Sequence, residues 1–394
     1  MLFIFSVFLF RLNYDYVVNS INSTMYAFSY RYGFISRGLA GTVYQFLNQI
    51  LPFDLMHNQC LTWYSLLLTW CVILLFLALV YVILEKCQER ERQYIKMFSV
   101  LLLIFLVPTF ATNYNLGRLD IYLVGIDILC CLLLIAEKLE WCIIPLSMIA
   151  VMLHQGYVFM YFSVILVILI YKFFTVEDKK KKRKYALIFI FSFLGASAFF
   201  LWFELFSHIS RNGVYEEIIS TAKILTSDGQ VHQDVIDHEI LGVDLSDREW
   251  GYHIMNFVQT PFVIVLFWPY IRITFSFFKK LIATSIKKED KIKYVMCGIG
   301  ALTIVPDLAL KIDYGRWLMA IVFYYLMVII CLLVLDKNTV EVWKEEIAAI
   351  KKKTSFAPIL LIYPMLLTPF YDICTNMLAT IGGNIVLNYF GLMP

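Results

Sequence analysis

The chain has 394 residues, of which 61% are hydrophobic and 16% are charged, and its formal net charge is +3. Soluble domains carry about 25% charged residues, so this composition and a mean hydropathy of +0.74 exclude an ordinary soluble protein. Apolar runs long enough to cross a bilayer as helices recur along the chain. The sequence therefore predicts an all-α fold, a polytopic integral membrane helix bundle with a cavity on its outer face.

About eleven membrane helices are expected, in a single transmembrane domain that covers residues 1–394. They are predicted at residues 2–18, 61–84, 97–112, 121–136, 141–153, 157–173, 186–206, 254–278, 294–310, 317–335 and 356–374. The helix at 141–153 is short, and His154-Gln155-Gly156 predicts a break after it. An amphipathic surface helix is expected after residue 336, and the tail 375–394 is compatible with one further short segment.

Lysine-rich loops alternate with loops poor in Lys and Arg. The lysine-rich loops lie at 86–96, 172–184, 279–293 and 336–353. The positive-inside rule places them in the cytoplasm and the polar segments between them on the outer side. The longest of these outer segments, 207–253, is expected to form a periplasmic loop or cap, with an amphipathic piece at 214–225 lying on the membrane.

Two arginine-containing motifs are predicted on the outer side. Residues 31–41 contain Arg31 and Arg37 among glycines. A planar guanidinium group can bind two oxygens of one phosphate or carboxylate at the same time. The alternative is a loop whose arginines touch lipid headgroups. In the second motif, Asp120 suits the N-terminus of a helix, whereas Arg118 is disfavoured there by the helix dipole. An arginine in that position indicates an anionic ligand.

The third motif is His154-Gln155, at the outer end of the short helix. A histidine can accept a proton near neutral pH, and a glutamine amide can orient a hydroxyl group. The alternative is a hydrogen-bonded core histidine without a catalytic role.

The fourth motif, residues 311–317, places several charges between two long apolar runs, with Asp307 just upstream. Charges near membrane helices are expensive and indicate function. Asp313 could act as a general base, while Lys311 and Arg316 could neutralise phosphate. The alternative is a helix boundary at the headgroup level, with Trp317 as an interface anchor.

Together the motifs predict one outer cavity that holds an amphipathic ligand, a lipid with a phosphate or pyrophosphate head that carries polar groups. The candidate catalytic residues are Asp120, His154 and Asp313, and the candidate substrate-binding residues are Arg31, Arg37, Arg118, Gln155, Lys311, Tyr314 and Arg316. No metal site is expected, because the histidines of 207–253 lack helical metal-ligand spacing. No cofactor is expected, and no glycine-rich phosphate loop indicates cytosolic nucleotide chemistry.

These motifs and the helix pattern resemble Wzy-type polymerases of bacterial O-antigen and capsular polysaccharides and, more loosely, the GT-C class of membrane glycosyltransferases. The resemblance spans most of the chain. It departs from the pattern at Gln155, where such proteins often carry a glutamate, so a catalytic carboxylate is missing there. The first outer segment also lacks the close acidic pair of many GT-C enzymes, since Asp15 and Asp54 are far apart. This favours a metal-independent polymerase.

The resemblance implies a multi-pass protein of the bacterial inner membrane, with its active site facing the periplasm. It would polymerise polyprenyl-pyrophosphate-linked oligosaccharide repeat units. The implied partners are this lipid-linked glycan and membrane lipids, with a flippase and a chain-length regulator as further candidates and no nucleic acid. Alternatives are a GT-C enzyme that adds one sugar from a polyprenyl-phosphate donor, a flippase or transporter for lipid-linked oligosaccharide, and an acyltransferase. Product length separates the first alternative from a polymerase.

Overall fold

The computed structural model describes residues 17–87, 89, 92–100, 102, 115–207, 214–227, 229–232, 235–237, 261, 264, 268, 270–306 and 314–353. The predicted helix at 356–374 lies outside these residues, as do residues 2–16 of the helix predicted at 2–18 and Asp307, Lys311 and Asp313. Helices and turns make up the described residues, which contain no strand, so the all-α prediction is confirmed for them.

The helices follow the predicted apolar runs, usually with a few more residues at one end. They are α2 (Ser20–Met25), η1 (Tyr30–Tyr32), α3 (Gly38–Ile50), α4 (Asn58–Lys86), α6 (Asp120–Ala136), η2 (Glu140–Cys142), α7 (Ile143–Leu153), α8 (Tyr157–Met160), α9 (Phe162–Thr175), α10 (Lys179–Phe206), α11 (Val214–Leu225), α14 (Lys288–Ile299), η3 (Gly300–Ile304), α16 (Tyr314–Leu335) and α17 (Lys337–Lys353). Residues 92–100 and 270–284 are also helical.

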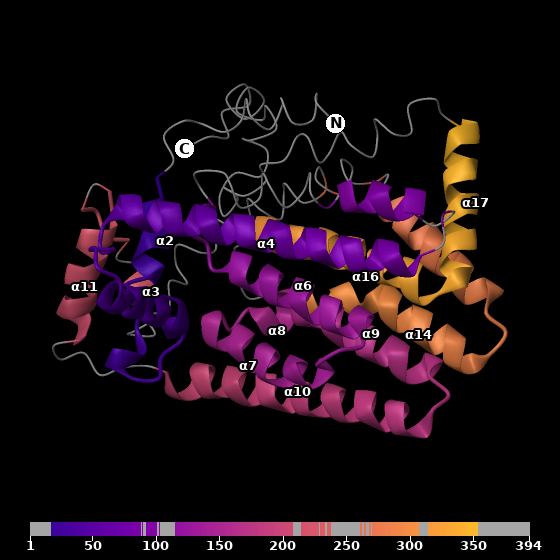
Figure 1. The fold of residues 1–394 in the computed structure, drawn as a ribbon, viewed down its shortest axis with the longest axis horizontal. Helices are drawn as coiled ribbons and strands as arrows, with labels where there is room; N and C mark the ends of the chain where they lie inside the picture. The colour runs from indigo at the N-terminus through magenta and orange to yellow at the C-terminus, as the bar shows by residue number, and fades with distance from the viewer. Residues whose placement is uncertain are drawn as a thin grey trace.

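The long helices run roughly lengthwise in one bundle (Figure 1). At one end lie α2, α3 and α11, which we call the loop end, while α17 stands across the opposite end. Among the described residues, three helices are long and apolar enough to cross a membrane: α4, α10 and residues Arg316–Leu335 of α16. These three are compatible with a membrane location. The apolar helices Glu140–Leu153 and Phe162–Thr175 are shorter.

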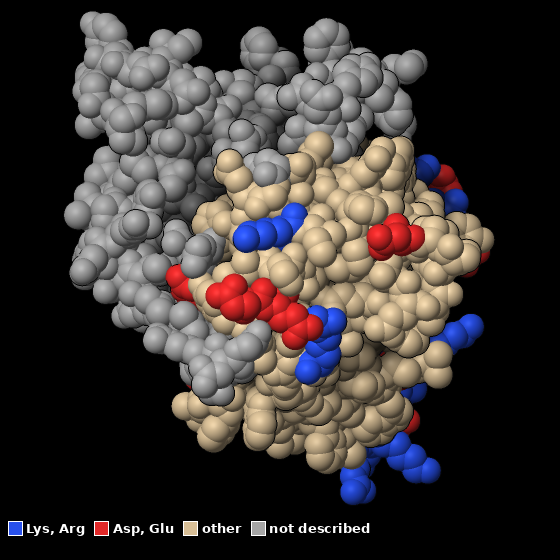
Figure 2. Space-filling model, turned by 90° about the vertical axis from the view of Figure 1, so that its left-hand side faces the viewer, with Lys and Arg blue, Asp and Glu red and all other residues tan. Residues whose placement is uncertain are grey.

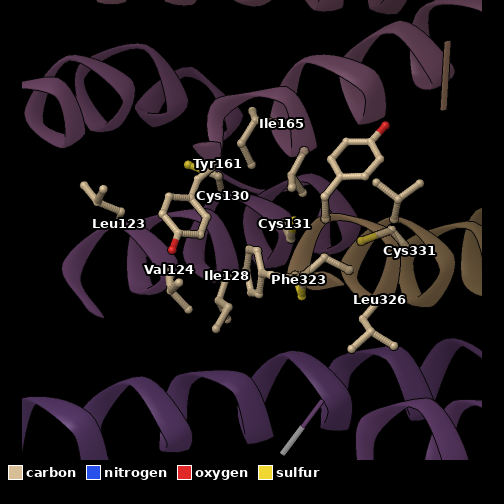
Figure 3. Packing of buried hydrophobic residues seen from close by; sticks show 14 of the residues in the cluster. Leu123, Val124, Ile128, Cys130, Cys131, Tyr161, Ile165, Phe323, Leu326 and Cys331 are labelled. Carbon is tan, nitrogen blue, oxygen red and sulfur yellow. The ribbon is translucent and has the colours of Figure 1, made fainter. Parts of the chain in front are cut away.

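The core centres on α6, which packs against α4, α7, α9 and α16. Figure 3 shows apolar side chains of α6 packed between Phe323, Leu326 and Cys331 of α16. A Cβ atom at Gly125 would lie 2.9 Å from Val72 Cγ2, so glycine permits the close approach of α4 and α6. Close contact of this kind is what holds helices together where lipid replaces water.

The predicted break after the short helix is confirmed. His154 is extended (φ −162°, ψ 119°) and ends α7, and the single turn α8 follows before α9 begins. Helix α17 also forms as expected, with Trp343 buried against Phe98 and Phe277 at centroid distances of 4.8 and 5.0 Å. Its apolar face therefore packs on protein.

Within the loop end, helix α11 packs on α2 and the loop after it. Its buried side chains Ile218 and Ala222 form a small second core with Ala27, Phe28 and Ile35. The expectation that 214–225 lies on the membrane is therefore revised, because the apolar face of this helix is used to contact α2 and the loop after it. Figure 2 looks onto this end, which is mostly uncharged, with acidic and basic side chains in contact near its centre.

Candidate functional site

The centre of the candidate site is an arginine that contacts two of the predicted catalytic residues. Arg316 Nη2 donates to Asp120 Oδ1 and Oδ2 at 3.2 and 3.1 Å and lies 3.0 Å from His154 Nε2. The Tyr161 hydroxyl also donates to Asp120 Oδ1, at 3.3 Å. The side chains of Asp120 and Arg316 are only 6% and 15% exposed. Three sequence motifs that lie far apart along the chain therefore meet in direct contact.

Helix dipoles favour Asp120 and disfavour Arg316. Asp120 is the first residue of α6, where the partial positive charge of the helix N-terminus favours a carboxylate. Arg316 is the third residue of α16, where the same effect opposes a cation. Asp120 offsets part of this cost. A buried ion pair is weak evidence for stability, and a buried cation that opposes the dipole of an apolar helix is a candidate functional residue.

His154 faces hydrogen-bond donors on both sides of its ring. The backbone N–H of Gly156 donates to Nδ1 at 2.9 Å, and Arg316 Nη2 lies 3.0 Å from Nε2. A neutral imidazole has one donor and one acceptor nitrogen, so one of these contacts places two N–H groups face to face. The tautomer of His154 therefore decides which of the two contacts is a hydrogen bond.

Gln155 joins the first motif to the third. The Ser36 hydroxyl donates to Gln155 Oε1, and Gln155 Nε2 donates to Glu204 Oε1 of α10 at 3.2 Å. The Tyr30 hydroxyl also donates to the carbonyl of Met152 at 3.2 Å, which fixes the loop on the end of α7. Glu204 was missed at the sequence level, although a single acidic residue near the end of an apolar run is a usable signal.

The remaining predicted arginines take different positions. Arg37 is the N-cap of α3, in the left-handed region at φ 58°, and its Nη1 lies 3.5 Å from Met25 Sδ. Arg118 is partly exposed just before α6. Arg31, however, pairs with Glu217 of α11 and donates to the Tyr32 hydroxyl at 2.6 Å. Arg31 thus belongs to the contact between α11 and the rest of the loop end.

The fourth motif is only partly described. Tyr314 begins α16, while Lys311 and Asp313 lie outside the described residues. Trp317 is 2% exposed, so the alternative that made it an interface anchor is wrong. Among the described residues, no three His, Cys, Asp or Glu side chains gather closely enough to hold a metal ion.

Asp127 is a buried acid that the sequence interpretation passed over. It is fully buried, and its Oδ1 accepts a hydrogen bond from the Tyr157 hydroxyl at 2.9 Å. Asp120 and Asp127 are seven residues apart on α6 and therefore share one face of the helix. An aspartate inside the apolar run 121–136 was the available signal.

An apolar groove of about 340 Å³ lies between the loop after η1 and helix α10. Phe34, Ala198, Phe199 and Trp202 line it. Within it, the Phe34 ring packs against Phe199 and Trp202 at centroid distances of 5.8 and 6.4 Å.

Comparisons with known proteins found no match: no family model fits the chain, and neither a curated protein nor a solved structure resembles it significantly.

Proposed function

We propose that the protein is a membrane glycosyltransferase that polymerises oligosaccharide repeat units carried on polyprenyl pyrophosphate. One observation carries the proposal: four motifs separated by up to 280 residues are linked by direct contacts, through Arg316 with Asp120 and His154 and through Gln155 with Ser36. Anion-binding and proton-accepting side chains are thereby collected at one end of a membrane helix bundle.

The charges of this end suit a pyrophosphate group. Arg37, Arg118 and Arg316 lie at or close to the N-termini of α3, α6 and α16. Helix N-termini provide backbone N–H donors and partial positive charge for phosphate oxygens. Guanidinium groups add charge-assisted hydrogen bonds. Fixed donors of this kind stabilise the charge that develops on a leaving pyrophosphate.

In the proposed reaction, a hydroxyl oxygen of the acceptor sugar attacks the anomeric carbon of the donor glycan. The new carbon–oxygen bond forms as the bond from that carbon to the pyrophosphate oxygen breaks, and pyrophosphate leaves with the electron pair. When the donor phosphate binds Arg316, Asp120 loses part of its charge partner and becomes the stronger proton acceptor. Asp120 then takes the hydroxyl proton, a role for which Asp313 is the second candidate.

The apolar groove between Phe34 and α10 suits the lipid part of such a donor. It is lined only by carbon-rich side chains and lies on α10, one of the three helices apolar enough to cross a membrane. A lipid-linked substrate would reach it from the bilayer. In the proposal, the protein lies in the bacterial inner membrane with about eleven spans, and the loop end faces the periplasm.

The test is chain extension in a host strain from which the gene is deleted. Arg316→Gln, produced at the wild-type level, should abolish long chains on a polysaccharide gel, because the leaving pyrophosphate loses its cation. Arg183→Gln is the matched control, since Arg183 is an exposed arginine of α10 near the opposite end of the bundle. Normal long chains with Arg316→Gln would overturn the proposal. A wild-type product with one added sugar in place of a ladder would assign single transfer instead of polymerisation.

A further inference from the structure

We propose that Asp127 is a positioning residue that acts as a neutral carboxylic acid and fixes the helix break that carries His154. The inference rests on the proposed function only where turnover is the readout. It concerns a residue that the proposed reaction does not use, since Asp127 lies two helical turns from Asp120 along α6.

Two acid–tyrosine pairs tie the break to α6. The Tyr157 hydroxyl donates to Asp127 Oδ1 at 2.9 Å, and the Tyr161 hydroxyl donates to Asp120 Oδ1 at 3.3 Å. Tyr157 is the first residue of α8, and Tyr161 follows its last residue. Both ends of this single turn are therefore held by carboxyl groups on one face of α6.

The position of α8 in turn sets the His154 ring. The backbone N–H of Tyr157 donates to the His154 carbonyl at 3.0 Å, and the N–H of Gly156 donates to His154 Nδ1 at 2.9 Å. A Cβ atom at Gly156 would lie 3.0 Å from His154 Cε1, so the ring and the break fit closely. A shift of Tyr157 would therefore move the imidazole relative to Arg316.

The surroundings of Asp127 favour its neutral form. The side chain is fully buried, and Oδ2 has no hydrogen-bond partner among the described residues. Four titratable groups interact electrostatically with Asp127, and none of them is a cation. They are Tyr157 and Tyr161 next to the break and Cys130 and Cys131 on α6 itself. A buried carboxylate without a counter-charge is strongly disfavoured. Asp120 differs, because Arg316 supplies its counter-charge.

The first experiment measures turnover of Asp127→Asn, Asp127→Leu and Tyr157→Phe. Asparagine keeps an oxygen acceptor for Tyr157 and carries no charge, so Asp127→Asn should keep turnover near the wild-type value. Asp127→Leu and Tyr157→Phe each remove the hydrogen bond, and turnover should fall ~10–100-fold because a small displacement of the site is costly. Turnover of the double variant Asp127→Leu with Tyr157→Phe should be no lower than turnover of the poorer of these two single variants. Loss of turnover in Asp127→Asn, or normal turnover in Tyr157→Phe, would overturn the proposal.

The second experiment needs no substrate. Difference infrared spectra of the purified protein at neutral pH should show a protonated carboxylic acid band that disappears in Asp127→Asn. Asp120→Asn is the matched control and should remove carboxylate bands instead. If Asp127→Asn removes carboxylate bands, Asp127 is ionised and the inference fails even if the glycosyltransferase assay succeeds. If the acid band is found but no polymer forms, only the proposed function fails.

Discussion

The two ends of α6 both carry buried charges, but they are built differently. At its first residue, Asp120 contacts Arg316 of α16, which in turn faces His154. At its last turn, Lys172 donates to the carbonyl of Leu134 at 2.6 Å, and Lys86 donates to the carbonyl of Ile135. We call this second region the lysine end.

Charges at the lysine end have matched partners. Glu137 accepts from Lys172 and Lys181, and Glu140 accepts from Lys184 and the Tyr185 hydroxyl. Cations at a helix C-terminus also agree with the helix dipole. At the other end, Arg316 opposes the dipole of α16, and His154 has a donor at each nitrogen. The comparison teaches that a buried charge alone does not mark a site, because the buried lysine at the lysine end agrees with the helix dipole and has carbonyl and carboxylate partners.

Breaking the Asp120–Arg316 pair should have the largest effect. Asp120→Asn removes the carboxylate from a buried ion pair, and breaking such a pair by removing one partner typically costs about 3–5 kcal/mol. We expect a large loss of thermal stability in detergent and loss of chain extension. Exchanging the two residues, Asp120→Arg with Arg316→Asp, should recover part of the stability but no activity, because the cation then stands on α6. Recovery of activity in the exchanged protein would show that the position of the cation does not matter.

Much of this contrast could be predicted from the sequence, but not its geometry. Single charged residues in or beside apolar runs indicated Asp120, His154 and Arg316, and the short helix before His154 indicated a break. Periodicity cannot say which motifs touch, because contacts such as Ser36 with Gln155 depend on how separate helices pack.

Two residues show contacts that the sequence interpretation could not supply. Arg31 was grouped with the other arginines, yet its partner Glu217 lies 186 residues away on α11 and could not be identified from local pattern. Asp127 was treated as part of an apolar run, because one acid among many leucines and isoleucines changes the hydropathy little. Its burial only becomes evident when α6 is surrounded by other helices.

At the lysine end, Glu140→Gln should lower stability without changing activity. The Glu140 side chain is 4% exposed and accepts hydrogen bonds from Lys184 and Tyr185. Loss of its negative charge weakens the charge-assisted hydrogen bond from Lys184 and leaves that ammonium group poorly satisfied. The expected cost is ~1–3 kcal/mol, measured as a lower thermal unfolding temperature in detergent. Chain extension should remain normal when the variant is produced at the wild-type level. A loss of long chains at normal protein level would place function at both ends of α6.

The smallest effect is expected for Glu137→Gln, and it should depend on pH. Burial raises the pKa of Glu137, but hydrogen bonds and charge from Lys181 and Lys172 lower it more, so the net pKa lies below its ordinary value. The stabilisation from a lowered pKa is present above the unfolded value of about 4.3 and is lost as the pH falls through the folded value. Since the side chain is 44% exposed, water screens these contacts, and the variant should lose less than about 1 kcal/mol near neutral pH. Unfolding temperatures of wild type and variant should converge in acid, and a difference that grows as the pH falls would contradict the paired geometry of the lysine end.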